Sequence, residues 1–85
     1  MKTKELWELV KNRKAKEVSE EILDEDDHGN LIESIFEVDG KFWMIHYEHS
    51  LNYDYNTFRQ GECDDPVEVW PKEVKKIIYT TNPNE

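Results

Sequence analysis

LIESIFEVDGKFWMIHYEHS, residues 31–50, is the stretch that decides the fold. Two apolar-rich runs of strand length lie on either side of Asp39-Gly40, a dipeptide typical of the two-residue turn of a β-hairpin. Such a turn fixes the register of the two strands and places Ile32 opposite Tyr47 at the far end. Alternation along each strand then predicts a core face that consists of Ile32, Phe36, Trp43, Ile45 and Tyr47.

The opposite face of this hairpin mixes two acidic side chains, Glu33 and Glu37, with three apolar ones, Ile35, Phe42 and Met44. The apolar three either form an exposed patch that binds a partner or belong to a second core face covered by another layer of the fold. The sequence leaves both interpretations open.

Residues 4–14 are predicted to form a helix ahead of the sheet. Leu6, Leu9 and Val10 recur at helical spacing and form one apolar stripe, and Thr3 is in position to cap the N-terminus. A helix of about three turns is not stable alone, so its stripe must pack on the sheet.

The segment between this helix and the hairpin is rich in charge. Residues 16–24 alternate apolar and charged side chains, which predicts a strand at an edge of the sheet. Residues 24–30 then form a turn, in which we expect Gly29 or Asn30 to adopt a positive φ.

The C-terminal part is predicted to contain a long loop and two short strands. The loop covers residues 51–65, and the first strand covers residues 66–70 and ends at Pro71, because proline cannot donate a ladder hydrogen bond. Residues 74–81 form the last strand, and residues 82–85 form a frayed tail.

A chain of 85 residues is long enough for one modest core, to which three Trp, four Tyr and three Phe contribute large areas. We therefore expect a single domain, residues 1–85. Its fold class is α+β, with the N-terminal helix packed on a small antiparallel β-meander of four to five strands.

Composition limits the location and the partners. Twenty acidic against eleven basic side chains give a net charge of −9, which disfavours direct binding to nucleic acid. A single cysteine suits a reducing compartment, and no apolar run has the length of a signal peptide or a membrane span. The sequence therefore predicts a cytoplasmic protein that does not contact membranes.

Metal binding and catalysis find little support. The turn that begins at Asp24 partly matches a calcium loop, but His28 and Ile35 stand at its fifth and twelfth positions, where oxygen ligands are needed. The three histidines and Cys63 lack zinc-site spacing, and the acidic neighbours of Cys63 disfavour its thiolate. We predict no metal, no cofactor, no catalytic residue and no enzymatic activity.

The negative charge is concentrated in the middle of the chain. Residues 1–16 carry six basic and two acidic side chains, whereas residues 17–68 carry sixteen acidic and two basic ones. Dense acidic clusters lie at residues 20–27 and 62–68, and Tyr53, Tyr55 and Phe58 lie between them in sequence. Such a pattern indicates a surface that binds a strongly basic protein, with the carboxylates occupying a groove built for phosphates.

The runs FEVDGKFW, residues 36–43, and VEVWPKEV, residues 67–74, resemble small acidic proteins encoded by phages and prophages. The resemblance implies an inhibitor of host defence, of the anti-CRISPR or anti-restriction type, that imitates DNA in part. The basic residues 1–16 depart from a uniformly anionic mimic, so a local acidic patch fits better than mimicry by the whole surface.

The first hypothesis is thus a non-enzymatic inhibitory domain that engages a basic, nucleic-acid-binding host protein. The alternative is a small protein-interaction or homodimeric module, assembled through a sheet edge or through the apolar patch of the hairpin. For the first hypothesis, the residues expected to contact the partner are Asp24, Asp26, Asp27, Asp64 and Asp65, which supply charge, and Tyr53, Tyr55 and Phe58, which supply contact area.

Overall fold

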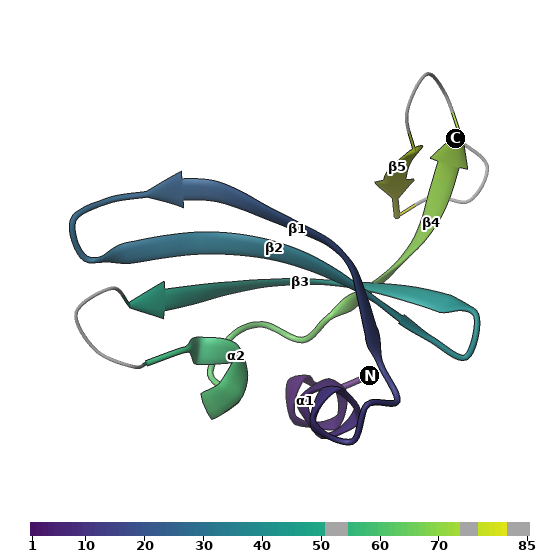
Figure 1. The fold of residues 1–85 in the computed structure, drawn as a ribbon, viewed down its shortest axis with the longest axis horizontal. Helices are drawn as coiled ribbons and strands as arrows, with labels where there is room; N and C mark the ends of the chain where they lie inside the picture. The colour runs from purple at the N-terminus through teal and green to yellow at the C-terminus, as the bar shows by residue number, and fades with distance from the viewer. Residues whose placement is uncertain (51–54, 74–76, 82–85) are drawn as a thin grey trace.

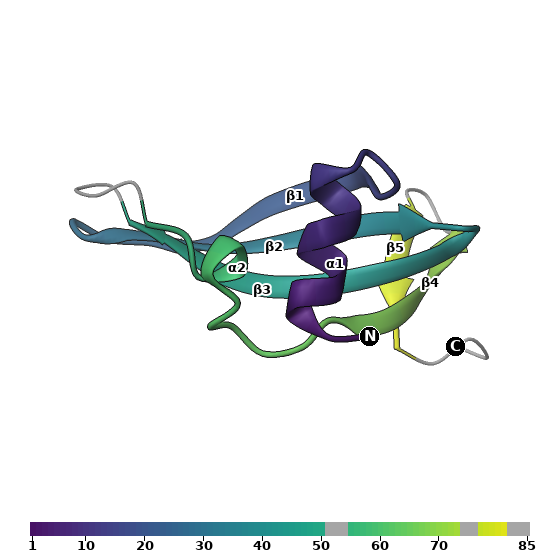
Figure 2. The ribbon, with the colours of Figure 1, turned by 90° about the horizontal axis from the view of Figure 1, so that it is seen from below.

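The computed structural model describes residues 1–50, 55–73 and 77–81. The five described strands form one antiparallel sheet in the order β1-β2-β3-β4-β5. Figure 1 shows both helices on one side of the curled sheet and the β4–β5 pair on the other, and Figure 2 shows α1 lying across the strands. The elements are α1 (Thr3–Lys11), β1 (Lys16–Glu25), β2 (Gly29–Val38), β3 (Lys41–Ser50), α2 (Thr57–Gln60), β4 (Val67–Glu73) and β5 (Ile77–Thr80).

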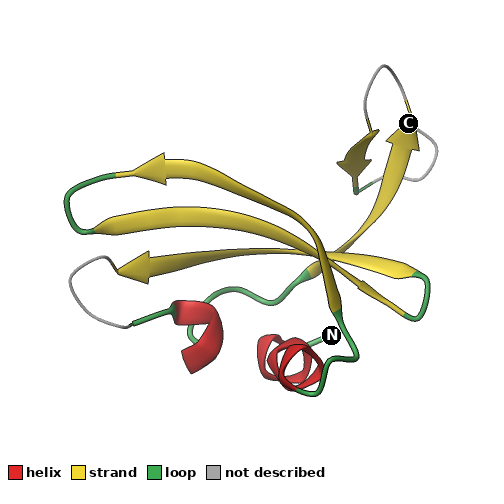
Figure 3. Cartoon of the chain, viewed as in Figure 1, coloured by secondary structure: helices red, strands yellow, loops and turns green. Residues whose placement is uncertain are grey.

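This architecture confirms the predicted α+β fold, in which an N-terminal helix packs on an antiparallel meander (Figure 3). The central hairpin has the expected register, with Ile32 opposite Tyr47, and pairing continues to Gly29 opposite Ser50. Asp39 and Gly40 both have positive φ, 51° and 82°, as a tight turn between twisted strands requires. The described helices include none that is long and apolar enough to span a membrane.

The core lies between the helices and the predicted face of the hairpin. Leu6 of α1 is fully buried, and Phe58 of α2 lies with its ring centroid 5.2, 5.8 and 5.4 Å from those of Trp7, Phe36 and Tyr47. The buried cluster consists of Leu6, Ile32, Phe36, Val38, Ile45, Tyr47 and Phe58, and Trp43 packs against it half-buried.

The other face of the hairpin forms a second, smaller buried layer. Ile35 and Val69 are 2% and 1% exposed, and the ring centroids of Phe42 and Tyr79 are 5.6 Å apart. Strands β4 and β5 therefore cover part of this face, and the core interpretation of Ile35 and Phe42 replaces the exposed-patch interpretation. Met44 beside them is half-buried.

Helix α1 is shorter than predicted, because Arg13 adopts a positive φ of 59° just beyond its end. Thr3 is not the N-cap but the first helical residue, and it is buried. The N–H of Thr3 donates to Asp65 Oδ1 at 3.0 Å, so a carboxylate that is distant in sequence accepts from the first turn of the helix.

The turn before the hairpin also differs from the prediction, because neither Gly29 nor Asn30 has a positive φ. Strand β1 continues to Glu25, and Gly29 already pairs with Ser50. A Cβ on Gly29 would lie 2.5 Å from the carbonyl oxygen of His49, so glycine is needed for close strand approach.

The segment predicted as a long loop contains α2, a single helical turn. Asn56 Oδ1 accepts from the N–H groups of Phe58 and Arg59 at 2.9 and 3.1 Å, and Gly61 ends the turn with a φ of 73°. Residues 51–54 of the predicted loop lie outside the described residues.

Pro71 does not end β4, contrary to the prediction. The strand changes partner there: Val67–Val69 pair with β3, whereas Trp70–Glu73 pair with β5, and Pro71 itself lies opposite Tyr79. The last strand, β5, is Ile77–Thr80. The strand is predicted to begin at residue 74, but residues 74–76 lie outside the described residues. The predicted tail, residues 82–85, lies outside them as well.

Candidate binding surface

The sheet register gathers carboxylates on the face that points away from the helices. Asp24 of β1 pairs with Leu31 of β2, which pairs with Glu48 of β3. One row further along, Glu21 pairs with Glu33, which pairs with His46. Cross-strand partners project to the same side of a sheet. We call the resulting group of four carboxylates the acidic face: Glu21, Asp24, Glu33 and Glu48.

The acidic face is exposed and weakly neutralised. Glu21, Asp24 and Glu48 are exposed, and within the described residues none of the three forms an ion pair with Lys or Arg. Glu33 Oε2 lies 2.9 Å from His46 Nε2. Glu21 lies directly opposite Glu33, a like-charge pair that disfavours the folded sheet. The close approach of these charges therefore lowers the stability of the folded sheet.

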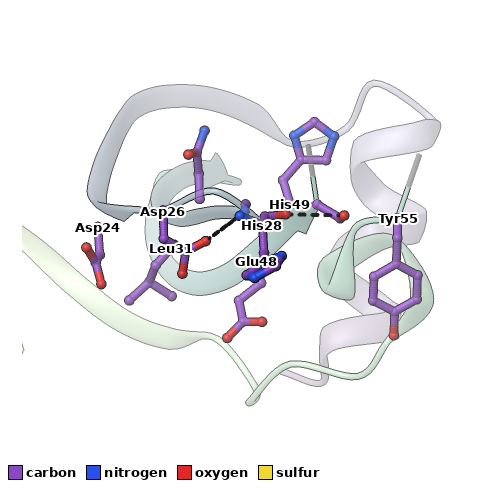
Figure 4. Close-up of a pocket in the computed structure, with 10 residues that line it drawn as sticks. Asp24, Asp26, His28, Leu31, Glu48, His49 and Tyr55 are labelled. Carbon is purple, nitrogen blue, oxygen red and sulfur yellow. Dashed lines mark hydrogen bonds between the residues drawn. The ribbon is translucent and has the colours of Figure 1, made fainter. Parts of the chain in front are cut away.

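A pocket of about 360 Å³ continues the acidic face toward the β1–β2 turn. Asp24, Leu31, Glu48 and Tyr55 are among its lining residues, and Figure 4 shows Asp24 and Leu31 on one side of Glu48 and Tyr55 on the other. The Asp26 carboxylate accepts from the N–H groups of His28 and Gly29 at 2.7 and 2.9 Å, and these two hydrogen bonds lower the pKa of the Asp26 carboxyl. Asp26 thus stays charged and holds the turn.

A second hollow of similar volume adjoins the first. Leu31 and Glu48 line both hollows, and the second adds Glu62 and Asp64. The two acidic clusters, separated in sequence, therefore lie around the same end of the sheet. The acidic surface is defined here as the acidic face plus Asp26, Glu62 and Asp64.

The predicted contact residues divide into those on this surface and those elsewhere. Asp24, Asp26 and Tyr55 line the first pocket, and Asp64 lines the second. Asp27 is exposed in the turn beside them, and Tyr53 lies outside the described residues. Tyr55 is 38% exposed, and its hydroxyl donates to Glu62 Oε2.

The two remaining predicted contacts have structural roles. Phe58 is 3% exposed, so its ring offers no area to a partner. Asp65 holds the start of α1, and its hydrogen bond from the Thr3 N–H, with further bonds from Thr3 Oγ1 and Lys2 Nζ, lowers the pKa of its carboxyl.

The predicted contact residues omit four carboxylates of this surface: Glu21, Glu33, Glu48 and Glu62. Glu21 and Glu62 belong to the dense acidic clusters but are not singled out within them, whereas Glu33 and Glu48 lie outside the clusters and join the surface only through strand pairing. The predicted hairpin register already held part of the signal, since it turned Glu33 away from the core.

Cys63 is the one thiol of the chain, and it is half-buried and free of any disulfide. Burial raises the pKa of the Cys63 thiol, and the charges of Asp64 and Asp65 raise it further, so the thiol is protonated at neutral pH. The described part of the chain contains no group of three or more His, Cys, Asp or Glu arranged to hold a metal ion.

The fold and surface define an α+β protein whose helices cover one face of a curled sheet and whose other face carries clustered carboxylates. Comparison with protein-family models, curated proteins and solved structures found no match.

We expect the free energy of unfolding to fall as the pH drops below about 4, the usual pKa of an aspartate. The pKa values of Asp26 and Asp65 are lowered in the folded state. Their stabilising contribution is therefore complete above the ordinary pKa and is lost as the pH falls through the lowered values. Urea unfolding followed from about pH 7 to about pH 2 measures the loss.

The matched control is the double variant Asp26→Asn, Asp65→Asn, which keeps oxygen acceptors but has no charge to titrate. The stability difference between the two proteins should shrink as the pH falls. Glu17, whose pKa is raised mainly by burial, acts in the opposite direction but is present in both proteins and cancels. A difference that stays constant with pH would contradict the assignment.

Proposed function

We propose that this protein is a non-enzymatic inhibitor that uses its acidic surface to bind a basic, nucleic-acid-binding host protein, of the anti-CRISPR or anti-restriction type. The observation that carries the proposal is the pair of cross-strand rows that fixes four carboxylates on one face, away from the helices. The proposed setting is the cytoplasm, and binding requires no cofactor.

The spacing of these charges supports partial imitation of DNA. Neighbouring strands lie about 4.8 Å apart, and alternate residues along a strand lie about 6.8 Å apart. Phosphates follow one another about every 3.4 Å of axis along one DNA strand, so the carboxylates form a sparser array of the same sign. Lys and Arg side chains that bind phosphate also pair with carboxylate.

The position of α1 leaves the acidic face unopposed. The helix packs on the other face of the sheet, and its two lysines are matched by Glu5 and Glu8, so it carries no net charge. The field of the four carboxylates therefore attracts a basic partner without opposition from this helix.

The alternative is a homodimeric assembly module that pairs through a sheet edge. It is favoured by one observation, the exposed apolar side chains Val18, Ile22 and Leu23 on β1. It is opposed by charge, because β1 carries Lys16 as its only basic residue against five acidic ones. Light scattering across concentration separates the two functions.

We expect Glu48→Lys to weaken partner binding by at least about tenfold, because it places a positive charge in the centre of the acidic surface. The protein is immobilised and incubated with bacterial lysate at low and at high salt, and the retained proteins are identified and then titrated in purified form. The expected partner is basic, binds nucleic acid and is released by salt.

Glu8→Lys is the matched control, since it makes the same change of net charge on α1, on the other face. It should leave binding within about twofold of the unmodified protein. Equal binding by both variants, or retention only of proteins that are not basic, would contradict the proposed function.

A further inference from the structure

Strand β1 is an exposed edge of the sheet. Among the described strands only β2 pairs with it, and every residue of Lys16–Glu25 except Ser19 is exposed. Its apolar side chains Val18, Ile22 and Leu23 are 36%, 49% and 46% exposed. The outer backbone N–H and C=O groups of such a strand are open to pairing with a further strand.

The chain treats the edge of β3 differently. Beyond Met44, where pairing with β4 stops, the N–H of Glu48 donates to Thr57 Oγ1 and the N–H of Ser50 donates to the carbonyl of Tyr55, both at 2.9 Å. His49 also forms a bridge with Asn56. The protein covers this edge with its own segment, whereas no described segment covers β1.

The charges of β1 decide what can occupy its edge. Two copies of β1 would bring together five acidic side chains from each, with one lysine each. Two register shifts, between Glu17 and Ser19 and between Ile22 and Asp24, disturb the ladder at those points for any added strand, so charge is what distinguishes a second copy from another segment. Charge repulsion therefore disfavours pairing of this edge with a second copy of the chain. A strand that carries positive charge is favoured instead.

We propose that an extended segment of the basic partner pairs with the free edge of β1 and adds a strand to the sheet. This inference rests on the proposed function, since it takes the partner to be basic. Toward the helices the added strand meets Glu20 and Ile22, and toward the acidic face it meets Glu21 and Asp24. The segment that fits carries Lys or Arg on both faces and an apolar side chain beside Ile22.

The probe is a synthetic peptide of about eight residues, with Lys and Arg interspersed with Val. Two control peptides carry the same side chains but are N-methylated at one or the other set of alternate backbone nitrogens. We expect the unmodified peptide to protect β1 amides from hydrogen exchange. One methylated peptide should bind about a hundredfold more weakly, because about four backbone hydrogen bonds are lost.

Equal binding by all three peptides would overturn strand addition but leave the proposed function standing, since charge alone would then explain the affinity. Lack of binding by any peptide would also overturn strand addition, while lysate capture with Glu48→Lys and Glu8→Lys tests the proposed function separately. A concentration-dependent dimer that excludes the peptide would assign the edge to a second copy instead.

Discussion

Replacement of Phe58 by alanine is expected to lower the free energy of unfolding by about 3–5 kcal/mol. The ring is 3% exposed and lies against the rings of Trp7, Phe36 and Tyr47, so its removal leaves a cavity between both helices and the sheet. The stability of a small domain is only about 5–10 kcal/mol, so this one change removes much of it. Urea unfolding followed by tryptophan fluorescence measures the loss.

Tyr55→Ala is the matched control for Phe58→Ala. Tyr55 is an aromatic residue of the same segment, but its side chain is 38% exposed and its hydroxyl donates to the exposed Glu62 instead of being buried in the core. It should change stability by about 0.5 kcal/mol or less. Similar losses for the two variants would show that Phe58 is not the residue that anchors α2.

The central hairpin is the part of the fold that the sequence predicts best. Asp39-Gly40 fixes the turn, the turn fixes the register, and a slip by one residue would bury Glu33 and Glu37 in place of the apolar face. Local chemistry and burial agree there. The edge position of β1 is also predicted, because a strand with this many charged side chains is not stable at the centre of a sheet.

The features that escaped prediction depend on contacts between distant residues. The local sequence around Phe58, with Asn56 before it and Gly61 after it, is typical of a polar loop, and only its packing on α1 makes it a core segment. In the same way, the carboxylate that closes the start of α1 comes from Asp65, which no local capping pattern indicates.

The acidic face shows the same limit. Simple alternation would turn Asp24 to the same side as Ile22, toward the helices. The register shift between Ile22 and Asp24 places Asp24 opposite Leu31 instead, and so on the face that carries Glu48. A bulge of this kind has no clear signature in one sequence. The high density of acidic residues at 20–27 therefore indicates which segment carries the charge, but not which of its side chains lie on the acidic face.

The same geometry predicts that Glu21→Lys changes stability and binding in opposite directions. In the folded sheet Glu21 lies opposite Glu33, so lysine replaces a repulsive cross-strand pair with an attractive one. We expect a gain of about 0.5–1 kcal/mol in the free energy of unfolding. Because the new charge stands on the acidic face, we expect at least about tenfold weaker binding to the basic partner. Urea unfolding and titration of the captured partner measure the two effects.

Glu25→Lys is the matched control for Glu21→Lys. It is also exposed on β1 and changes the net charge equally, but its cross-strand partner is the uncharged Asn30, so it relieves no directly opposed pair. Its gain in stability should be clearly smaller than that of Glu21→Lys. Opposite changes of stability and affinity confined to Glu21 would mean that the like-charge pair serves recognition at the expense of the fold. If Glu21→Lys raised stability and left binding unchanged, the acidic face would be a solvated surface and the proposed function would lose its main support.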